Sequence, residues 1–310
     1  MTDSAPSTPD TAPNNWVDHT PKTIRPYLRL MRADRPIGTW LLLIPCLWGL
    51  ALAAAAGHEG SNLFWYPLLF AVGAYVMRGA GCAYNDIVDR DFDAKVARTA
   101  LRPIPSGQIS VKKAWAFLAF LCLVGLAVLL QFNGFTVLLG LGSLVLVAGY
   151  PFMKRITYWP QAWLGLTFNW GALVGFAAAA GTLAPEAFAI YAAGVFWTLF
   201  YDTIYAHQDT EDDALIGVKS TALRLGAATP NWLVGFAGLT LLGFAVSGIF
   251  INAHPFYYVA LFPAAAHFIW QIKTLDIHDS HNCLRLFKSN RDTGLLLLFA
   301  PICERIIHLL

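Results

Sequence analysis

Two short stretches of this chain carry the side chains whose types and spacing could do chemistry. The first, Y-N-D-I-V-D-R-D-F-D, ends at Asp93 and places an asparagine and four aspartates within nine residues. Asp86, Asp89 and Asp93 fall at i, i+3 and i+7, so a helix would carry three carboxylates on one face. Because like charges on one face repel each other, we expect a divalent cation to neutralise them. Mg²⁺ held by one or two carboxylates takes phosphate oxygens as further ligands.

The acidic pattern returns further along the chain, in Y-D-T-I-Y-A-H-Q-D-T-E-D-D, which begins at Tyr201. Asp202, Asp209 and Asp213 are spaced by seven and four residues, which predicts a second acidic helix face. Each stretch follows an apolar run, and a carboxylate in a membrane helix costs roughly 2.5–3.5 kcal/mol at mid-bilayer. One acidic helix end in water would need no special role, but two equivalent clusters indicate a functional site.

Basic side chains follow each acidic cluster at once. Lys95, Arg98 and Arg102 come after the first cluster, and Lys219 comes after the second. A diphosphate held by metal ions and by these cations is the ligand that such an arrangement would suit. The competing interpretation is that these Lys and Arg residues only mark the side of the membrane on which their loops lie.

The composition predicts what must position these clusters. The 310 residues are 57% hydrophobic and 13% charged, which is typical of multi-spanning membrane proteins surrounded by lipid. The net charge is only +2, and we expect no nucleic acid among the partners. We predict an all-α fold, a polytopic membrane bundle of nine transmembrane helices around a central cavity. The single transmembrane domain is expected over residues 25–310, after a disordered tail over residues 1–24. The apolar stretches lie near residues 36–56, 64–84, 113–132, 135–153, 160–181, 186–206, 231–252, 256–274 and 292–309.

Lys and Arg lie almost entirely on one side of this predicted bundle. Of the 21 Lys and Arg residues, all except Arg78 and Arg305 fall before the first predicted span or at every second connection between spans, beginning with the one after the second span. These connections all lie on the same side of the membrane as the leading segment. The positive-inside rule then places the amino terminus and both acidic clusters on the cytoplasmic side. Residues 1–20 have acidic side chains but no Arg and no apolar run, unlike a transit peptide or a secretory signal. We therefore expect a bacterial inner membrane.

The two acidic motifs, N-D-x-x-D-x-x-x-D ending at Asp93 and D-x-x-x-D ending at Asp213, resemble those of the UbiA superfamily of intramembrane prenyltransferases. The strings D-R-P-I-G-T-W, R-P-I-P-S-G, Y-P-F-M-K-R and Y-D-T-I-Y-A-H-Q-D resemble its 4-hydroxybenzoate polyprenyltransferase branch, over about residues 25–310. The resemblance implies an Mg²⁺-dependent enzyme of ubiquinone biosynthesis. It would transfer a polyprenyl group from polyprenyl diphosphate to the ring carbon of 4-hydroxybenzoate ortho to the hydroxyl.

The resemblance also implies which side chains hold the metal and the substrates. The metal-binding and catalytic set is Asn85, Asp89, Asp93, Asp209 and Asp213. Asp86 and Asp202 are second choices that would orient ligands or basic residues. The substrate-binding candidates are Asn85, Lys95, Arg98, Arg102, Lys154, Lys219, Arg35, Tyr150, Tyr205 and Arg155. Arg155 is assigned to the carboxylate of the aromatic acid, because a planar guanidinium pairs bidentately with a carboxylate.

Other interpretations stay open beside this one. A prenyltransferase of the same superfamily could use another acceptor, such as naphthoate, homogentisate or haem. An ion-coupled transporter also carries intramembrane carboxylates, usually near the midplane of the membrane. The carboxylates of this chain are instead predicted at one membrane face. A membrane scaffold would not need two costly acidic clusters. His207 could accept a proton, although a polar histidine at a helix end is the plainer interpretation. The five cysteines show no paired spacing and are expected to pack as small apolar residues.

Overall fold

The computed structural model describes residues 15–58, 64–95 and 99–310, and at Asp212 it describes only the backbone. Within these residues every regular element is a helix, which confirms the predicted all-α class. The chain divides into two compact units, and each is described by itself. Unit 1 comprises Met1–Thr39 and Ala71–Gln131, and unit 2 comprises Trp40–Phe70 and Phe132–Leu310.

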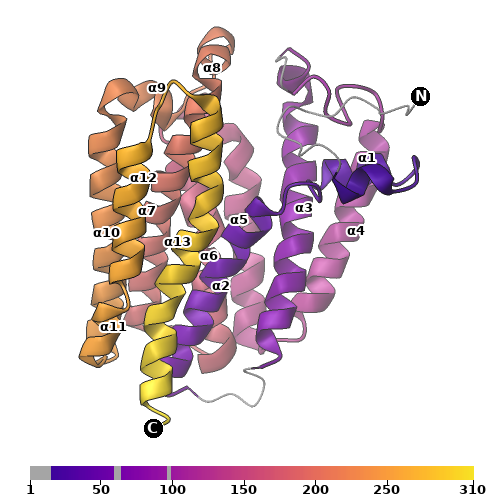
Figure 1. Cartoon of the computed structure of the whole chain (residues 1–310). Coiled ribbons are helices and arrows are strands. Elements are labelled where there is room, and N and C mark those ends of the chain that lie inside the picture. The colour runs from indigo at the N-terminus through magenta and orange to yellow at the C-terminus, as the bar shows by residue number, and fades with distance from the viewer. Residues whose placement is uncertain (1–14, 59–63, 96–98) are drawn as a thin grey trace. The chain divides into compact units, whose positions relative to one another are not determined.

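Unit 1 is built on the long helix α3 (Tyr66–Asp93), which enters the unit at Ala71. α1 (Arg25–Leu30), α4 (Val111–Leu129) and the 3-10 turn η1 (Trp16–His19) complete it (Figure 1). Apolar side chains from all four elements form one buried core, which stabilises the unit by removing them from water. The carboxyl end of α3, where the first acidic motif lies, is therefore anchored on a packed scaffold.

The described part of the predicted tail belongs to that scaffold. Asn15 caps η1 by accepting a hydrogen bond from the backbone nitrogen of Val17 at 2.9 Å. Val17 is fully buried in the core of unit 1. The guanidinium of Arg29 lies 2.9 Å from the carboxylate of Asp18. From Asn15 onward this segment is therefore ordered and packed, in place of the disorder expected for it.

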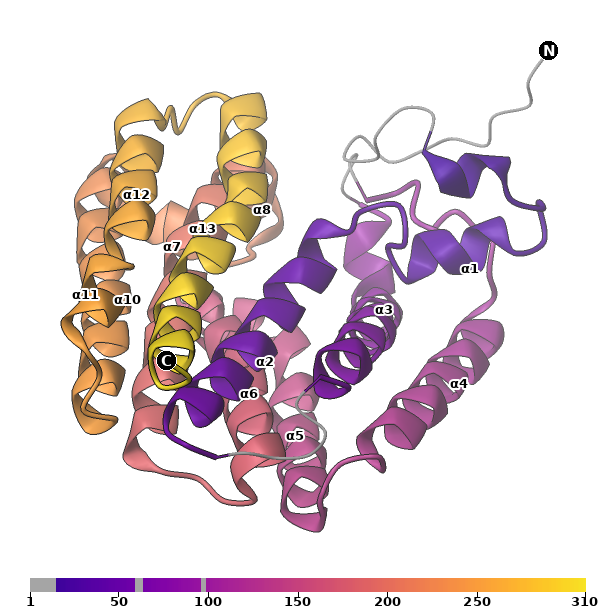
Figure 2. The same ribbon diagram turned by 60° about the horizontal axis from the view of Figure 1, so that its bottom comes forward.

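Unit 2 is a bundle of longer helices. Its helices are α2 (Ile37–Ala55, from Trp40 onward), α5 (Gly134–Ile156), α6 (Pro160–Ala180), α7 (Pro185–Ala206), α10 (Thr229–Phe250), α11 (Pro255–Val259), α12 (Phe262–Thr274) and α13 (Ser280–Ile307). Within the bundle α7 packs against α6, α10 and α13, and α12 packs against α10 and α13 (Figure 2). In the core of the bundle the ring of Trp48 packs against that of Trp197 in a tilted arrangement and against that of Phe244 edge to face, with centroids 4.8 and 5.0 Å apart. The indole nitrogen of Trp48 donates to the carbonyl of Gly294 at 2.8 Å, which ties α2 to α13.

The glycine-rich helix α6 packs very closely against α2. A Cβ atom on Gly175 would stand 2.0 Å from the carbonyl oxygen of Cys46 in α2. A Cβ atom on Gly49 would stand 1.9 Å from the carbonyl oxygen of Ala172 in α6. The two backbones approach each other too closely for any larger residue at these positions. Within a membrane the hydrophobic effect does not drive helices together, and close packing through small residues takes its place.

A network of buried polar side chains joins α7, α12 and α13 in unit 2. Asn290 donates to the Oε1 of Gln271 at 2.9 Å and accepts from the indole of Trp197 at 3.2 Å. Gln271 donates to the hydroxyl of Thr293 at 2.8 Å. Each amide is satisfied inside the bundle, as a polar group in an apolar setting must be.

The number of spans stays a prediction. In the described part of the chain, six helical segments are long and apolar enough to cross a membrane: Ile37–Ala55, Val111–Leu129, Gly134–Ile156, Pro160–Ala180, Pro185–Asp209 and Thr221–Phe250. The stretch expected over residues 256–274 is divided into α11 and α12. The last expected span is part of α13, which begins earlier, at Ser280. The outward faces of α4 and α5 carry exposed apolar side chains, as a lipid surface would require: Phe120, Leu123, Leu138 and Val145.

Candidate functional site

The first acidic motif lies on the last turns of α3, which continues as one helix to Asp93. The predicted single helix for Asp86, Asp89 and Asp93 is therefore correct. Their exposed fractions are 1%, 0% and 6%, so none of the three carboxylates faces bulk water. A buried carboxylate is costly unless a cation or several donors lie against it. The partners of these aspartates therefore decide what the motif can do.

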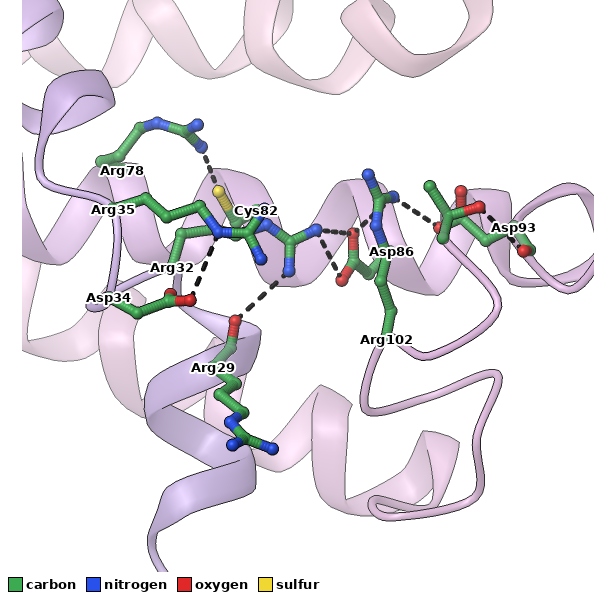
Figure 3. Close-up of polar contacts among 10 residues, drawn as sticks. Arg29, Arg32, Asp34, Arg35, Arg78, Cys82, Asp86, Asp93 and Arg102 are labelled. Atoms are coloured by element: carbon green, nitrogen blue, oxygen red, sulfur yellow. Dashed lines mark hydrogen bonds and ion pairs between the residues drawn. The ribbon is translucent and has the colours of Figure 1, made fainter. Parts of the chain in front are cut away.

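Two guanidinium groups lie against the motif (Figure 3). The Nη2 atom of Arg32 donates to Oδ1 of Asp86 at 2.8 Å and to Oδ2 at 3.1 Å. The Nη1 atom of Arg102 lies 3.2 Å from Oδ1 of Asp86 and 2.7 Å from Oδ2 of Asp93. Asp86 is therefore held between two arginines, and Arg102 bridges two carboxylates on the same helix face.

In the sequence, Arg32 is one of several Lys and Arg residues that indicate membrane orientation. Its contact with Asp86 of the motif is visible only in the structure. Arg32 stands between α1 and α2 with φ 61°, a left-handed conformation that is uncommon for a residue other than glycine. Strain of this kind costs roughly 1–3 kcal/mol and persists only where the surroundings enforce it. Arg32 and Asp86 are 54 positions apart, so sequence spacing could not have paired them.

The electrostatics of the cluster keep Arg32 charged. Burial by itself lowers the pKa of Arg32, but the carboxylates around it, first Asp86 and also Asp34 and Asp93, raise the pKa above its ordinary value. Arg32, Arg102 and the three aspartates together carry one excess negative charge.

The segment after α3 returns to the same helix face. The hydroxyl of Thr99 donates to the carbonyl of Asp93 at 2.8 Å. The backbone nitrogen of Arg102 donates to the carbonyl of Thr99 at 2.9 Å, and that of Ser106 to the carbonyl of Arg102 at 3.0 Å. Gly107 ends the turn with φ 75°, a conformation that favours glycine. These bonds carry Arg102 to the motif from a segment that the sequence shows only as a loop.

The other candidates of unit 1 lie at different distances from this cluster. Asn85 is half-buried on α3, one residue before Asp86, and Lys95 is exposed just beyond the helix. Arg35 pairs with Asp34 at 3.3 Å, and Asp34 is buried. Arg98 lies outside the described residues.

The second motif, in unit 2, differs from the prediction. α7 ends at Ala206, a 3-10 turn η2 (His207–Asp209) follows, and a new helix α8 (Thr210–Ile216) begins. Asp202, Asp209 and Asp213 therefore do not share one continuous helix face, as the spacing of seven and four suggested. The break lies at Asp209, the N-cap residue of α8, whose backbone (φ −119°, ψ 9°) leaves the helical conformation. Asp213 lies one turn into α8.

The side chains around the second motif are well anchored. His207 is buried, and its Nε2 atom lies 3.0 Å from the hydroxyl of Thr229, so it has a structural partner. The ring of Tyr205 packs on that of Phe287 with centroids 4.4 Å apart. Tyr201 is buried and receives a hydrogen bond from the hydroxyl of Thr198 at 3.0 Å. The plainer interpretation of His207, as a satisfied helix-end histidine, agrees with these contacts.

The remaining basic candidates meet at the carboxyl end of α5. The backbone nitrogen of Lys219 donates to the carbonyl of Lys154 at 2.9 Å, and its ammonium donates to the carbonyl of Ile156 at 3.1 Å. Arg155 is exposed, with its guanidinium 5.7 Å from the ring centroid of Phe152. Tyr150 is half-buried one turn earlier. The structure thus brings Lys219 to Lys154, the neighbour of Arg155, although Lys219 lies far from both in sequence.

The donor atoms of each motif suit a hard cation. Amide and carboxylate oxygens are the ligands that Mg²⁺ takes, and Mg²⁺ keeps most of its other positions for water and phosphate. Among the described residues, no group of three or more His, Cys, Asp and Glu side chains is gathered as a complete metal cage. The assignment of Asn85, Asp89 and Asp93, and of Asp209 and Asp213, as metal ligands stays a prediction.

Comparisons with known proteins agree on one family. The profile of the UbiA prenyltransferase family matches residues 42–297. The human protein named 4-hydroxybenzoate polyprenyltransferase, mitochondrial, is 52% identical over 288 residues, which are 92% of this chain and 77% of the relative. Proteins of the same name from Caenorhabditis elegans and Arabidopsis thaliana are each 49% identical. The matches cover 95% and 94% of this chain, and 82% and 72% of those relatives.

Solved structures show the same fold. A UbiA homolog from Aeropyrum pernix superposes with a TM-score of 0.70 at 22% identity, covering 87% of this chain and 98% of that chain. A UbiA homolog from Archaeoglobus fulgidus, solved bound to DMAPP and Mg²⁺, superposes with a TM-score of 0.64 at 21% identity. That match covers 89% of this chain and 99% of the other.

The predicted bacterial inner membrane, with cytoplasmic loops, is wrong. The relatives that share about half of their residues with this chain are mitochondrial proteins. The prediction of the compartment depended on the composition of residues 1–20 alone. A membrane helix bundle with the same spans and acidic motifs is compatible with either compartment, so these features could not correct the error.

Proposed function

Because the chain belongs to the UbiA prenyltransferase family, we propose that it transfers a polyprenyl group to the ring carbon of 4-hydroxybenzoate ortho to the hydroxyl. The donor is a polyprenyl diphosphate, and the product enters ubiquinone biosynthesis. One observation carries this proposal: identity of about half, over more than nine-tenths of the chain, to relatives named for that activity. We place the enzyme in the mitochondrial inner membrane, with its Lys- and Arg-rich loops facing the matrix.

The acidic motifs hold the diphosphate end of the donor. Asn85, Asp89 and Asp93 on α3 would hold metal and diphosphate in unit 1, and Asp209 and Asp213 around the start of α8 would do so in unit 2. Bound Mg²⁺ would neutralise the negative charge that develops on the departing diphosphate. The Archaeoglobus fulgidus homologs solved with Mg²⁺ and DMAPP or GPP support this choice of metal and ligand. Arg102, Lys95, Arg98 and Lys219 add fixed positive charge on the same side.

The chemistry is a substitution at an allylic carbon. The bond between that carbon and the diphosphate oxygen breaks, and its electron pair leaves with the diphosphate. The ring carbon ortho to the hydroxyl then forms the new carbon–carbon bond, because the hydroxyl donates electron density to it. A ring proton is lost to restore the aromatic ring. Tyr150 and Tyr205 would stabilise the allylic cation through their ring faces, and the apolar surroundings keep water from quenching it.

The aromatic acid is oriented through its carboxylate. Arg155 is our choice of partner, because its guanidinium can form two parallel bonds to a carboxylate. Lys154 and Lys219 lie beside it at the end of α5 and would favour an anion there. Arg35 serves as the alternative partner in unit 1.

Product analysis tests the proposal directly. Membranes containing the protein would be supplied with Mg²⁺, a polyprenyl diphosphate and a panel of aromatic acceptors, and the products identified by mass spectrometry. We expect prenylated 4-hydroxybenzoate, with the new bond ortho to the hydroxyl. Prenylation of naphthoate, homogentisate or haem in its place would keep the family and change the substrate. Ion flux in vesicles without any prenyl transfer would reject the proposal.

A further inference from the structure

Arg32 holds the first acidic motif without belonging to any set of substrate or metal contacts named above. Its side chain is 10% exposed, and its Nη2 atom contacts both oxygens of Asp86. Its Nη1 atom donates to the carbonyl of Arg29 at 3.2 Å, which fixes the plane of the guanidinium. Both terminal nitrogens of the guanidinium are thus hydrogen-bonded (Figure 3).

We propose that Arg32 is a positioning residue: it fixes the carboxylate of Asp86, and through Asp86 it sets the place of the Arg102 guanidinium beside Asp93. The kinetic consequence of this inference rests on the proposed prenyl transfer. The structural consequence is the ordering of residues 99–110, the segment that carries Arg102, and it does not depend on the proposed function.

The geometry of Asp86 carries the first step. Arg32 contacts both oxygens of the carboxylate, while Arg102 contacts only Oδ1, at 3.2 Å. The same Nη1 atom of Arg102 continues to Oδ2 of Asp93 at 2.7 Å. The orientation that Arg32 imposes on Asp86 therefore decides whether Arg102 can touch both aspartates at once.

The charges carry the second step. Asp86 is 1% exposed, and a carboxylate so enclosed needs a full positive charge against it. While Arg32 supplies that charge, Arg102 remains available to Asp93, which belongs to the predicted metal set. Without Arg32, Asp86 would compete with Asp93 for Arg102, and Arg102 would be displaced along α3.

The backbone carries the third step. Arg32 keeps φ 61° while its amide donates to the carbonyl of Arg29 at 3.1 Å and its carbonyl accepts from the amide of Arg35 at 3.0 Å. A strained conformation held by neighbouring bonds is typical of a residue whose side-chain direction matters. This turn aims the guanidinium of Arg32 at α3 and not along its own segment.

Hydrogen exchange tests the structural consequence. We would compare purified wild type with Arg32→Gln and with Arg29→Gln, the matched control. Arg29 lies on the same segment, is similarly enclosed at 11% exposure, and pairs with Asp18 away from the motif. In Arg32→Gln we expect faster amide exchange over residues 99–110, where the amides of Arg102 and Ser106 are hydrogen-bonded. Arg29→Gln should leave this segment unchanged.

A double-mutant cycle tests the kinetic consequence. Arg32→Gln and Asp86→Asn should each lower kcat by roughly 10- to 100-fold, the size expected for a lost charge-assisted contact. The KM for 4-hydroxybenzoate should change less than 3-fold or so, because the acceptor site is elsewhere. Once Asp86→Asn is present, adding Arg32→Gln should cost little more, since Arg32 acts through Asp86. Arg32→Lys should recover part of kcat, because an ammonium keeps the charge but loses the fork.

Each outcome decides between a positioning role and a merely structural one. Unchanged exchange over residues 99–110 in Arg32→Gln would overturn the inference, as would equal losses in Arg32→Gln and Arg29→Gln. Multiplicative losses in the double variant would mean that Arg32 acts independently of Asp86, and would also overturn it. If Arg32→Gln does not fold, Arg32→Lys and Asp86→Asn carry the same comparisons. A wild type without any prenyl transfer would reject the proposed function, and the exchange comparison would still decide the role of Arg32.

Discussion

The Nη1 atom of Arg102 lies 2.7 Å from Oδ2 of Asp93 and 3.2 Å from Oδ1 of Asp86. A residue of the loop after α3 is therefore joined to two carboxylates that stand two helical turns apart. This relationship makes the first acidic motif a cluster in which aspartates of α3 are paired with arginines from other segments.

The metal-binding set makes the first prediction. Asp89→Ala, Asp93→Ala, Asp209→Ala and Asp213→Ala should each lower turnover at least roughly 100-fold, the effect of losing one transition-state contact. Steady-state prenyl transfer in detergent micelles measures this, with expression level as the control. EDTA should have the same effect, and added Mg²⁺ should reverse it. Full activity in excess chelator would contradict the use of a metal.

Arg155 makes the second prediction, which concerns the acceptor. Arg155→Ala should weaken the use of 4-hydroxybenzoate by roughly 10- to 150-fold, because a charge-assisted hydrogen bond contributes about 1.5–3 kcal/mol. The KM for the prenyl diphosphate should change much less. Kinetics with each substrate varied in turn separate the two effects. A rise only in the KM for the prenyl diphosphate would move Arg155 to the diphosphate site.

Gly175 makes the third prediction, which concerns stability. Gly175→Ala places a methyl group against the carbonyl of Cys46, so it should destabilise unit 2 by roughly 1–3 kcal/mol. Gly235→Ala is the matched control, since nothing lies within 4 Å of its Cβ position. Alanine there should leave stability unchanged or raise it by up to about 1 kcal/mol. Thermal unfolding of both variants in the same detergent gives the comparison, and equal melting temperatures would argue against the close α2–α6 contact.

The distribution of Lys and Arg makes the fourth prediction. Ser106 and His254, both exposed, should lie on opposite sides of the membrane, with Ser106 on the matrix side. Cysteines at these two positions can be labelled with an impermeant thiol reagent in intact and in inverted inner-membrane vesicles. Background from Cys283 should be low, because burial raises the pKa of its thiol to about 11. Labelling of both positions from the same side would refute this topology.

The acidic residues show what sequence reasoning could and could not achieve. Asp86, Asp89 and Asp93 were predicted on one helix, and they are on one helix, because their spacing and the apolar run before them are local properties. The same reasoning failed at Asp209, where a helix start interrupts the periodicity. The backbone at Asp209 leaves the helical conformation, and the spacing of the aspartates carries no signal of that change.

Pairings between distant residues could not be derived in the same way. Arg102 was predicted to contact a diphosphate, while its contacts with Asp86 and Asp93 depend on how the loop folds back. Lys154 and Lys219 meet at the end of α5 only because the segment before α9 (Thr221–Leu225) passes there. The hydrogen bond between Lys219 and Lys154 joins backbone atoms, which carry no sequence signal at all.

Sequence reasoning was enough to predict the all-α class, the apolar segments, the two acidic motifs and the family to which they point. These features are set by composition and by spacing along one helix, and both can be read without knowing the fold. The pairing of Arg32 with Asp86 and the end of α7 before Asp209 became visible only in the folded chain. A pair of buried charges 54 positions apart is chosen by packing, because each charge must find whichever opposite charge the folded chain brings within reach.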